Sequence, residues 1–212
     1  MSRAVPILLA VGALLLAGCG SGKHAKPDAS GCIPVQKPDT AGRTRPRPTT
    51  KLELTRKYDV TIDTNCGEFT IRLDPSQSPN ATASFASLVE SNFYDGTLLH
   101  RIQPGFVIQA GDPTATGTGG PGYTTVDKPP ADARYTHGVV AMAKTGVQPP
   151  GTAGSQFFVV TAADASLTAD YAIVGTVVQG LDVVDRIGKL GDSNGHPTEQ
   201  VEIQRATLRG FK

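Results

Sequence analysis

The stretch YDVTIDTNCGEFTIRL, residues 58–73, alternates apolar and polar residues on both sides of the short sequence TNCG. Successive side chains of a strand point to opposite faces, so the alternation gives each half one apolar face and one polar face. Two such runs around a short polar turn predict a β-hairpin. The chain is therefore expected to fold around half-buried antiparallel strands.

Further short apolar or alternating runs follow the hairpin, and a segment opened by Pro79 has helical spacing. Long glycine-rich connections such as GDPTATGTGGPGY separate several runs, and long loops in a compact domain are usually functional or disordered. Seven or eight strands with only two helices predict a mainly β domain, a barrel or a sandwich. A barrel also leaves no strand edge exposed. The expected strands are 98–102, 106–110, 138–142, 156–161, 172–178 and 201–211, and the expected helices are 79–91 and 180–190.

The N-terminal sequence MSRAVPILLAVGALLLAGCG is typical of an export signal. Arg3 precedes an apolar run over 4–17, and small residues follow it. That run is short for a membrane span. The closing LAGC resembles the lipobox of bacterial lipoproteins, which implies a signal peptide over 1–18 and a diacylglyceryl group on Cys19. The alternative is an ordinary signal peptide with a chance cysteine. We expect an extracytoplasmic protein, anchored to the cell membrane through Cys19 without spanning it.

Residues 19–57 are rich in Pro, Thr, Gly and Ser and have no apolar period. Such a composition buries too little apolar surface to offset chain entropy, which predicts a flexible linker. The linker is basic, with nine lysines and arginines against three acidic residues, whereas 58–212 is acidic. A solvated spacer is the plain interpretation, and contact with anionic lipid headgroups is the alternative. No cluster of basic and aromatic residues indicates nucleic-acid binding.

Two cysteines remain once Cys19 is set aside, namely Cys32 and Cys66. An even pair in an exported chain suggests a disulfide. It would join the linker to the first hairpin. The alternative is two free thiols, with Cys66 buried as a small apolar side chain.

The stretch LLHRIQPGFVIQAGD, residues 98–112, holds one cation, one aromatic ring and one amide in a mostly apolar run. With FYDGT before it, GDPTATGTGGPGY after it, and HGVVAMAKTG and GSQFFVVT further on, it resembles the cyclophilin-type peptidyl-prolyl cis-trans isomerases. The resemblance covers about 58–212. It implies a closed eight-stranded antiparallel β-barrel capped by two α-helices, and catalysis of cis–trans isomerisation at X–Pro bonds in exported proteins.

The chemistry explains why one fixed arginine is enough. Rotation about X–Pro meets a barrier of ~18–20 kcal/mol because the C–N bond has double-bond character. In the twisted amide the nitrogen regains its lone pair, and a donor aimed at it binds this state better than either planar one. An apolar cleft strengthens the interaction. No nucleophile, acid–base pair, metal or cofactor is required.

The resemblance also assigns roles to single residues. Arg101, Phe106 and Gln109 form the catalytic set, with Gln109 binding substrate backbone and helping to orient Arg101. Phe106 and Phe158 form the floor and wall of the proline pocket, and the turn 117–120 borders a neighbouring subsite. Substrate binding is assigned to Val107, Ala143, Lys144, Thr145, Gln156, Phe158, Leu167 and Tyr171.

Several positions depart from the family pattern. Lys144 stands where many members have Asn, and Tyr171 where many eukaryotic members have His. Ser166 takes the place of the tryptophan that contacts cyclosporin, and the chain has no Trp, so we expect weak cyclosporin binding.

His100 and Asp112 are given no chemistry. We expect His100 to be structural and hydrogen-bonded, and Asp112 to serve the turn after its strand. The other histidines show no metal-ligand spacing.

We expect a monomer that acts on proline-containing polypeptides. A proline-binding chaperone or scaffold module with little turnover is the competing function. A structural envelope lipoprotein has less support, because that role would not need such a cleft.

Overall fold

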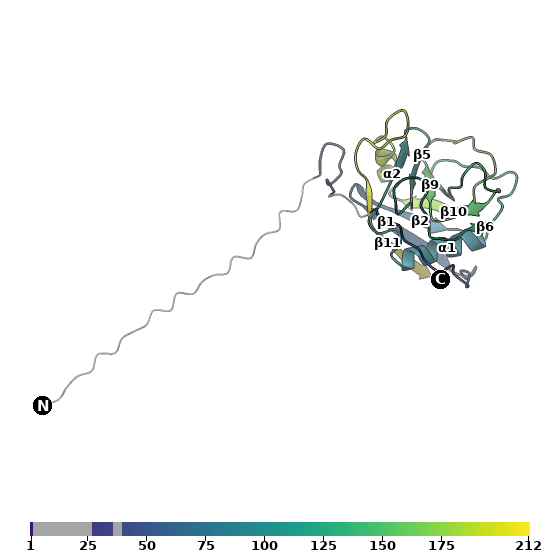
Figure 1. Cartoon of the computed structure of the whole chain (residues 1–212), viewed down its shortest axis with the longest axis horizontal. Helices are drawn as coiled ribbons and strands as arrows, with labels where there is room; N and C mark the ends of the chain where they lie inside the picture. Colours follow the sequence, from purple (N-terminus) through teal and green to yellow (C-terminus); the bar gives the residue numbers. More distant parts are fainter. Residues whose placement is uncertain (2–26, 36–39) are drawn as a thin grey trace.

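The computed structural model describes residue 1, residues 27–35 and residues 40–212. The expected signal peptide and Cys19 lie outside the described residues. Within the described part, no helix has the length and apolar character needed to cross a membrane. A domain of curved strands and two helices occupies the C-terminal part of the chain (Figure 1).

The predicted hairpin is confirmed. β1 (Lys57–Thr64) pairs antiparallel with β2 (Gly67–Leu73), so that Val60 faces Ile71 and Ile62 faces Phe69. These four side chains are buried. The apolar residues of the alternating sequence thus lie on the face of the hairpin that packs into the core, and most of the polar residues lie on the other face.

The remaining strands join the hairpin in one antiparallel sheet of nine strands, in the order β3-β11-β1-β2-β10-β7-β9-β5-β4, while β6 and β8 form a separate ribbon. The predicted strands 98–102 and 106–110 become three, because Leu99 and His100 interrupt the first. The strands are β3 (Thr97–Leu98), β4 (Arg101–Gln103), β5 (Val107–Ala110), β6 (Thr125–Val126), β7 (Val139–Met142), β8 (Thr152–Ala153), β9 (Phe157–Val160), β10 (Ile173–Gln179) and β11 (Glu202–Phe211).

The sheet curls so that its two edge strands approach each other. β3 and β4 are the edges, yet only two residues separate them in the chain. One isolated bridge joins Leu98 of β3 to Asp112, two residues after the end of β5. A mainly β fold with two helices is therefore confirmed, with nine strands in the main sheet in place of the expected eight. Full closure of the barrel stays a prediction.

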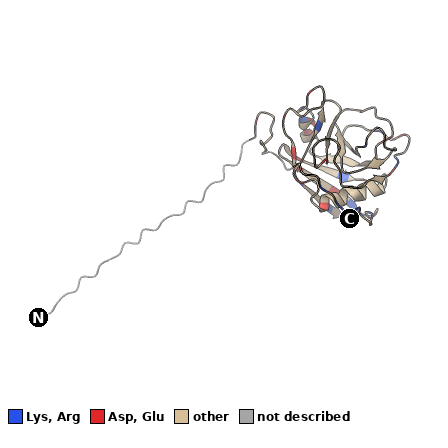
Figure 2. Ribbon diagram, viewed as in Figure 1, with Lys and Arg blue, Asp and Glu red and all other residues tan. Residues whose placement is uncertain are grey.

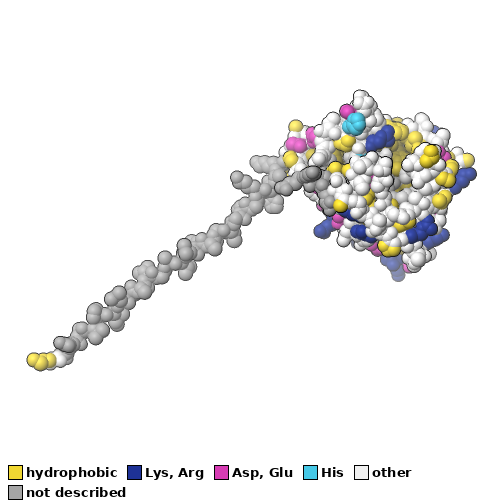
Figure 3. Space-filling view, in the orientation of Figure 1, with side chains coloured by type: hydrophobic (Ala, Val, Ile, Leu, Met, Phe, Trp, Pro, Cys, Tyr) yellow, Lys and Arg dark blue, Asp and Glu magenta, His cyan; other side chains and the backbone are white. Residues whose placement is uncertain are grey.

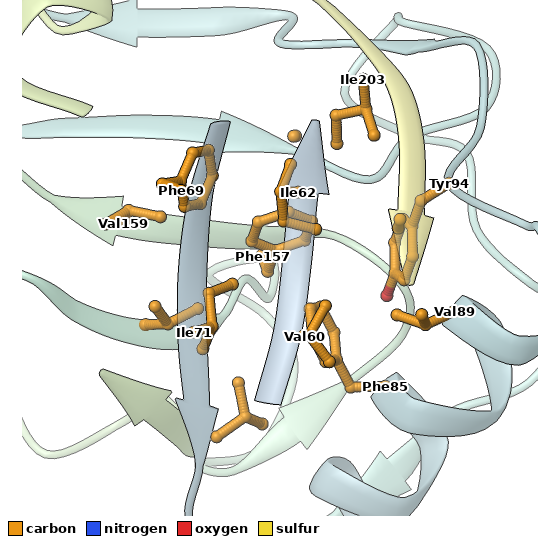
Figure 4. Close-up of a cluster of buried hydrophobic side chains, with 14 of the residues drawn as sticks. Val60, Ile62, Phe69, Ile71, Phe85, Val89, Tyr94, Phe157, Val159 and Ile203 are labelled. Carbon is orange, nitrogen blue, oxygen red and sulfur yellow. The ribbon is translucent and has the colours of Figure 1, made fainter. Parts of the chain in front are cut away.

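The core lies inside the curled sheet, and helix α1 (Pro79–Glu90) covers it. Figure 4 shows Phe85 and Val89 of this helix pointing toward the strand residues. The ring centroid of Phe85 lies 5.2 Å from that of Tyr94 and 5.2 Å from that of Phe157. The second helix, α2 (Leu181–Ile187), is shorter and buries Val184 and Ile187. Both helices lie where the sequence predicts them.

Cys32 and Cys66 form a disulfide. Of the two alternatives left by the sequence, the structure has the cross-linked one. Hydrogen bonds surround it, because the Ile33 N–H donates to the Asn65 carbonyl (2.7 Å) and the Asn65 amide donates to the Ile33 carbonyl (2.9 Å). The bond ties the N-terminal segment to the turn between β1 and β2.

The linker prediction is corrected for the part that the structure describes. Residues 40–56, which we name the strap, contain no helix or strand but pack against the domain. Arg43 donates hydrogen bonds to the carbonyl oxygens of Phe93 (3.0 Å) and Asp95 (2.6 Å). The Glu53 N–H donates to the Tyr58 hydroxyl (3.1 Å). The composition predicted a flexible coil. It could not reveal the packing, because hydrogen bonds from side chains to carbonyls distant in sequence leave no local sequence pattern.

Basic positions gather near the C-terminus, where β1 begins and β11 ends (Figure 2). In the space-filling view, lysine and arginine side chains lie along the lower edge of the domain (Figure 3).

The disulfide should contribute measurably to stability. The cross-linked residues are 34 apart in sequence, and closing a loop of this length removes chain entropy worth up to about 4 kcal/mol. We expect the Cys32→Ser/Cys66→Ser variant to unfold at a lower denaturant concentration, with its free energy of unfolding reduced by at most about 4 kcal/mol. Peptide mapping of unreduced protein should find neither cysteine alkylated, and free thiols at both positions would contradict the pairing.

Candidate active site

Four adjacent strands place the central site residues in one row. Arg101 of β4 pairs with Gln109 of β5, Gln109 with Phe158 of β9, and Phe158 with Ala141 of β7. Residues directly opposite each other on neighbouring strands share a face of the sheet. The row therefore brings a guanidinium, an amide and a ring together.

The opposite face of the same strands belongs to the core. The next row along runs from Ile102 through Ile108 and Val159 to Val140, and all four lie in the main hydrophobic cluster. Alternation along each strand thus assigns one row to the core and the other to the site. The period of two in the sequence thus decides which residues share a face with Arg101.

Phe106 reaches Arg101 through a tight turn. The Phe106 N–H donates to the Gln103 carbonyl (3.0 Å), and Gly105 between them has a φ of +68°, which glycine adopts without strain. The guanidinium carbon of Arg101 lies 5.6 Å from the centre of the Phe106 ring. Arg101 makes no ion pair or side-chain hydrogen bond with another described residue.

A second cluster of apolar side chains includes the Phe106 ring on which this arginine lies. Val107 and Phe158 are buried members of this cluster, and Phe106, Leu167 and Tyr171 are partly buried against it. The Phe158 and Tyr171 rings meet edge to face at 5.4 Å between centroids. Five residues to which the sequence assigns catalysis or substrate binding thus lie together.

The sequence did not reveal Tyr135, which fixes the position of Tyr171 in this cluster. Its hydroxyl donates to the Tyr171 carbonyl (2.8 Å) and accepts from the Tyr171 N–H (2.9 Å). Burial raises the pKa of the Tyr135 hydroxyl, which keeps it protonated as a donor. The stretch RYTHG carries no signal for this role, because the two tyrosines meet only through the fold.

A groove lies beside Gln109 along a glycine-rich segment. Gln109 donates to the Gln156 side-chain oxygen (3.0 Å), and Gln156 donates to the carbonyls of Gly117 and Gly119 (2.9 Å each). Residues 117–124, which we name the groove loop, form one wall. The groove has a volume of about 470 Å³, and its other lining residues include Gln109, Ala143, Lys144, Thr145, Gln148, Gly154, Ser155 and Gln156.

Comparison with known proteins identifies the fold and the family. The family model described as "Cyclophilin type peptidyl-prolyl cis-trans isomerase/CLD" matches residues 59–208. The chain belongs to the cyclophilin family. It is a peptidyl-prolyl cis-trans isomerase, as its curated relatives are named.

Two relatives and one solved structure illustrate the similarity. "Peptidyl-prolyl cis-trans isomerase-like 1" of Emericella nidulans is 38% identical over 155 residues, covering 71% of this chain and 94% of the relative. "Probable peptidyl-prolyl cis-trans isomerase A" of Mycobacterium bovis is 35% identical over 168 residues, covering 70% and 91%. A cyclophilin of Cryptosporidium parvum superposes with a TM-score of 0.67 at 31% identity, covering 74% of this chain and 99% of that one.

The side chain of Lys144 makes its contacts within the domain. Its side chain is only 4% exposed, and its ammonium lies 3.4 Å from the Asp170 carboxylate. The ammonium also donates to the Gln148 carbonyl (3.2 Å) and lies 5.5 Å from the Tyr171 ring centre. Lys144 thus lines the groove while its charge is used to hold the loop that follows it.

Gln109 stands opposite Arg101 but makes no hydrogen bond to it among the described residues. Its amide donates to Gln156 instead. The geometry therefore links Gln109 to the groove loop, and direct orientation of the arginine stays a prediction.

His100 is half-buried. Both ring nitrogens are buried, and no group among the described residues meets them with full hydrogen-bond geometry, although the Gln156 side chain and the Leu98 backbone approach the ring. The hydrogen bond expected of His100 stays a prediction. Burial lowers the pKa of the imidazole, which favours the neutral ring. No group of three or more His, Cys, Asp or Glu side chains suited to a metal occurs within the described ranges.

Asp112 organises the start of the groove loop, as the sequence predicts. The buried carboxylate accepts hydrogen bonds from the Thr114 N–H and hydroxyl (2.7 Å each) and from the Gly119 N–H (3.0 Å). A Cβ at Gly119 would lie 2.0 Å from this carboxylate, so only glycine fits there. Burial alone would raise the pKa of Asp112, but these hydrogen bonds outweigh it and hold the pKa below its usual range.

Stability should therefore fall in acid through Asp112. A carboxyl whose folded pKa is lowered contributes stability that is present above its unfolded pKa, near 4, and is lost as the pH falls through the folded pKa. We expect Asp112→Asn to cost about 1–3 kcal/mol at pH 7, a difference that shrinks below about pH 4. Urea unfolding across this range would measure it, with exposed Asp132→Asn as control; a constant difference would contradict the assignment.

Proposed function

We propose that Arg101 catalyses X–Pro rotation by donating a hydrogen bond to the nitrogen of the twisted amide. The observation that carries this proposal is the guanidinium, which lies over the Phe106 ring beside an apolar cluster and has no ion pair or side-chain hydrogen bond with another described residue. A lone pair becomes available on the proline nitrogen only when resonance is broken. The arginine thus favours the twisted state over both planar states, which is what lowers a barrier.

We further propose that a proline ring packs against this cluster, which we name the proposed proline pocket. Phe106 and Leu167, which are only partly buried, offer apolar surface to a ring without a hydrogen-bond donor, and the buried Val107 and Phe158 lie beneath them in the same cluster. The groove beside it provides room for the residues that flank the proline. A similar cyclophilin from Cryptosporidium parvum has been solved in the presence of the dipeptide Ala-Pro, with a TM-score of 0.65 at 31% identity. Proline-containing polypeptides are the proposed substrates.

The curled sheet is further proposed to act as a closed barrel. Support comes from the single Leu98–Asp112 bridge and from the two-residue connection between β3 and β4. Closure would fix Arg101 relative to the groove loop. We also propose that the protein is a monomer, and that it binds cyclosporin weakly because Ser166 stands in place of a tryptophan.

The proposed setting is the outer side of a cell membrane, where the enzyme acts on exported proteins as a lipid-anchored lipoprotein. Arg3, the apolar run and LAGC support export and lipid attachment at Cys19. The disulfide between Cys32 and Cys66 fits an oxidising compartment. Uncatalysed X–Pro isomerisation takes tens to hundreds of seconds and can limit folding there.

Replacing Arg101 tests the proposed mechanism. We expect Arg101→Ala to lower kcat/KM by about 10²–10³, the loss typical of one donor aimed at a transition state. Arg101→Lys keeps the charge but lacks the planar fork, so an intermediate rate is expected. The measurement is a protease-coupled assay on an X–Pro peptide, with exposed Lys128→Ala as the matched control. Wild-type turnover by folded Arg101→Ala would overturn the mechanism.

Replacing Cys19 tests the proposed setting. We expect Cys19→Ala, expressed in a bacterium with lipoprotein processing, to move the protein from the membrane fraction to the soluble fraction, since the lipid chains are its proposed anchor. Ser21→Ala is the control and should leave it in the membrane fraction. A soluble wild-type protein would contradict the lipid anchor.

A further inference from the structure

The strap reaches the groove loop, although it lies outside the part of the chain that matches the family. The family match begins at residue 59, after the strap ends. We propose that the strap braces the groove loop from outside, with Arg45 and Arg47 as positioning residues that set how tightly the groove holds the residues flanking the proline. This inference rests on the proposed substrate site.

The sequence of the strap suits a brace. Residues 43–48 read RTRPRP, with an arginine at every second position. Proline fixes its own φ and pushes the residue before it toward an extended conformation. Side chains two apart in an extended segment share one side. The three arginines can therefore all face the domain with little loss of chain entropy.

One end of the brace is fixed to a rigid part of the domain. Arg43 binds the carbonyls of Phe93 and Asp95, and Arg45 donates to the Ser91 carbonyl (3.2 Å). The Arg45 guanidinium also lies 5.7 Å from the centre of the Phe93 ring. Phe93 is fully buried and lies three residues after the end of α1. The strap is thus anchored to the core before it reaches the loop.

The other end contacts the groove loop. The Arg45 N–H donates to the Pro121 carbonyl (2.9 Å), and the Arg47 guanidinium donates to the Thr124 carbonyl. Thr44 packs so closely on Gly122 that a Cβ there would lie 3.3 Å from the threonine methyl. Pro121, Gly122 and Thr124 all line the groove. The strap and the proposed substrate thus meet the same short segment.

The groove loop depends on such external contacts. It contains four glycines (117, 119, 120 and 122), which lose more conformational freedom on ordering than other residues. Gln156 and Asp112 hold its first half through Gly117 and Gly119. In its second half, Tyr123 bonds the Ser84 hydroxyl (2.9 Å), and the strap supplies the bonds to Pro121 and Thr124.

The consequence is a division of labour between the pocket and the groove. Ordering a loop before binding reduces the entropy lost when a ligand binds. Arg45 and Arg47 make no described hydrogen bond or ion pair with Arg101 or Phe106. It therefore acts on affinity for a long substrate and leaves the chemical step to the pocket.

The test compares two ligands on full-length protein. The long ligand is a peptide with three residues on each side of its proline, and the short one is blocked Ala-Pro. We expect Arg47→Ala to raise the Kd of the long peptide about three- to tenfold more than that of the dipeptide, the range of one hydrogen bond. NMR titration measures Kd, and hydrogen exchange should be faster at the amides of Gly120, Gly122 and Thr124. Arg47→Lys, which keeps a donor, should restore part of the affinity.

The control is Lys51→Ala, which removes an exposed strap cation with no described bond to the groove loop. Equal weakening of both ligands by Arg47→Ala, or the same change in Lys51→Ala, would overturn the proposal. Unchanged affinity and unchanged hydrogen exchange in Arg47→Ala would also overturn the proposal, because the strap would then not order the groove loop. Because Kd and exchange need no turnover, an inactive wild-type protein would refute the proposed function separately.

Discussion

The pairing of β4, β5, β9 and β7 decides what each face of this sheet contains. With Arg101 opposite Gln109 and Gln109 opposite Phe158, the site occupies one face and the core the other. A slip of one residue would exchange the two faces, burying a guanidinium in the main cluster. The cost of burying an unpaired charge is large, so the same energy that protects the core also fixes the geometry of the site.

The loops around the site are held by buried or half-buried polar side chains more than by strand pairing. Asp112 and Gln156 hold the start of the groove loop, and Lys144 holds the next loop through the Gln148 carbonyl. Polar groups in such places are stabilising only when fully satisfied. The site thus combines a rigid row of strand residues with loops whose order comes from a few hydrogen bonds.

The sequence predicted the elements whose signal is local. The hairpin sequence alternates apolar and polar residues, both helices have helical spacing of apolar residues, and the motif around Arg101 is contiguous. All of these elements appear where the sequence predicts them. The strap, the Tyr135–Tyr171 contact and the burial of Lys144 were missed because each depends on a partner distant in sequence. An arginine in a proline-rich segment is normally predicted to be exposed to solvent. The carbonyl groups that the strap arginines bind can be found only from the fold.

The position of the disulfide determines how the domain carries load. Both the strap and β1 lie between Cys32 and Cys66, inside a covalently closed loop. A force that pulls on the chain before Cys32 passes through the sulfur–sulfur bond directly into the turn between β1 and β2. The strap therefore bears no tension, and the contacts of Arg45 and Arg47 are insulated from mechanical pulling at the N-terminus.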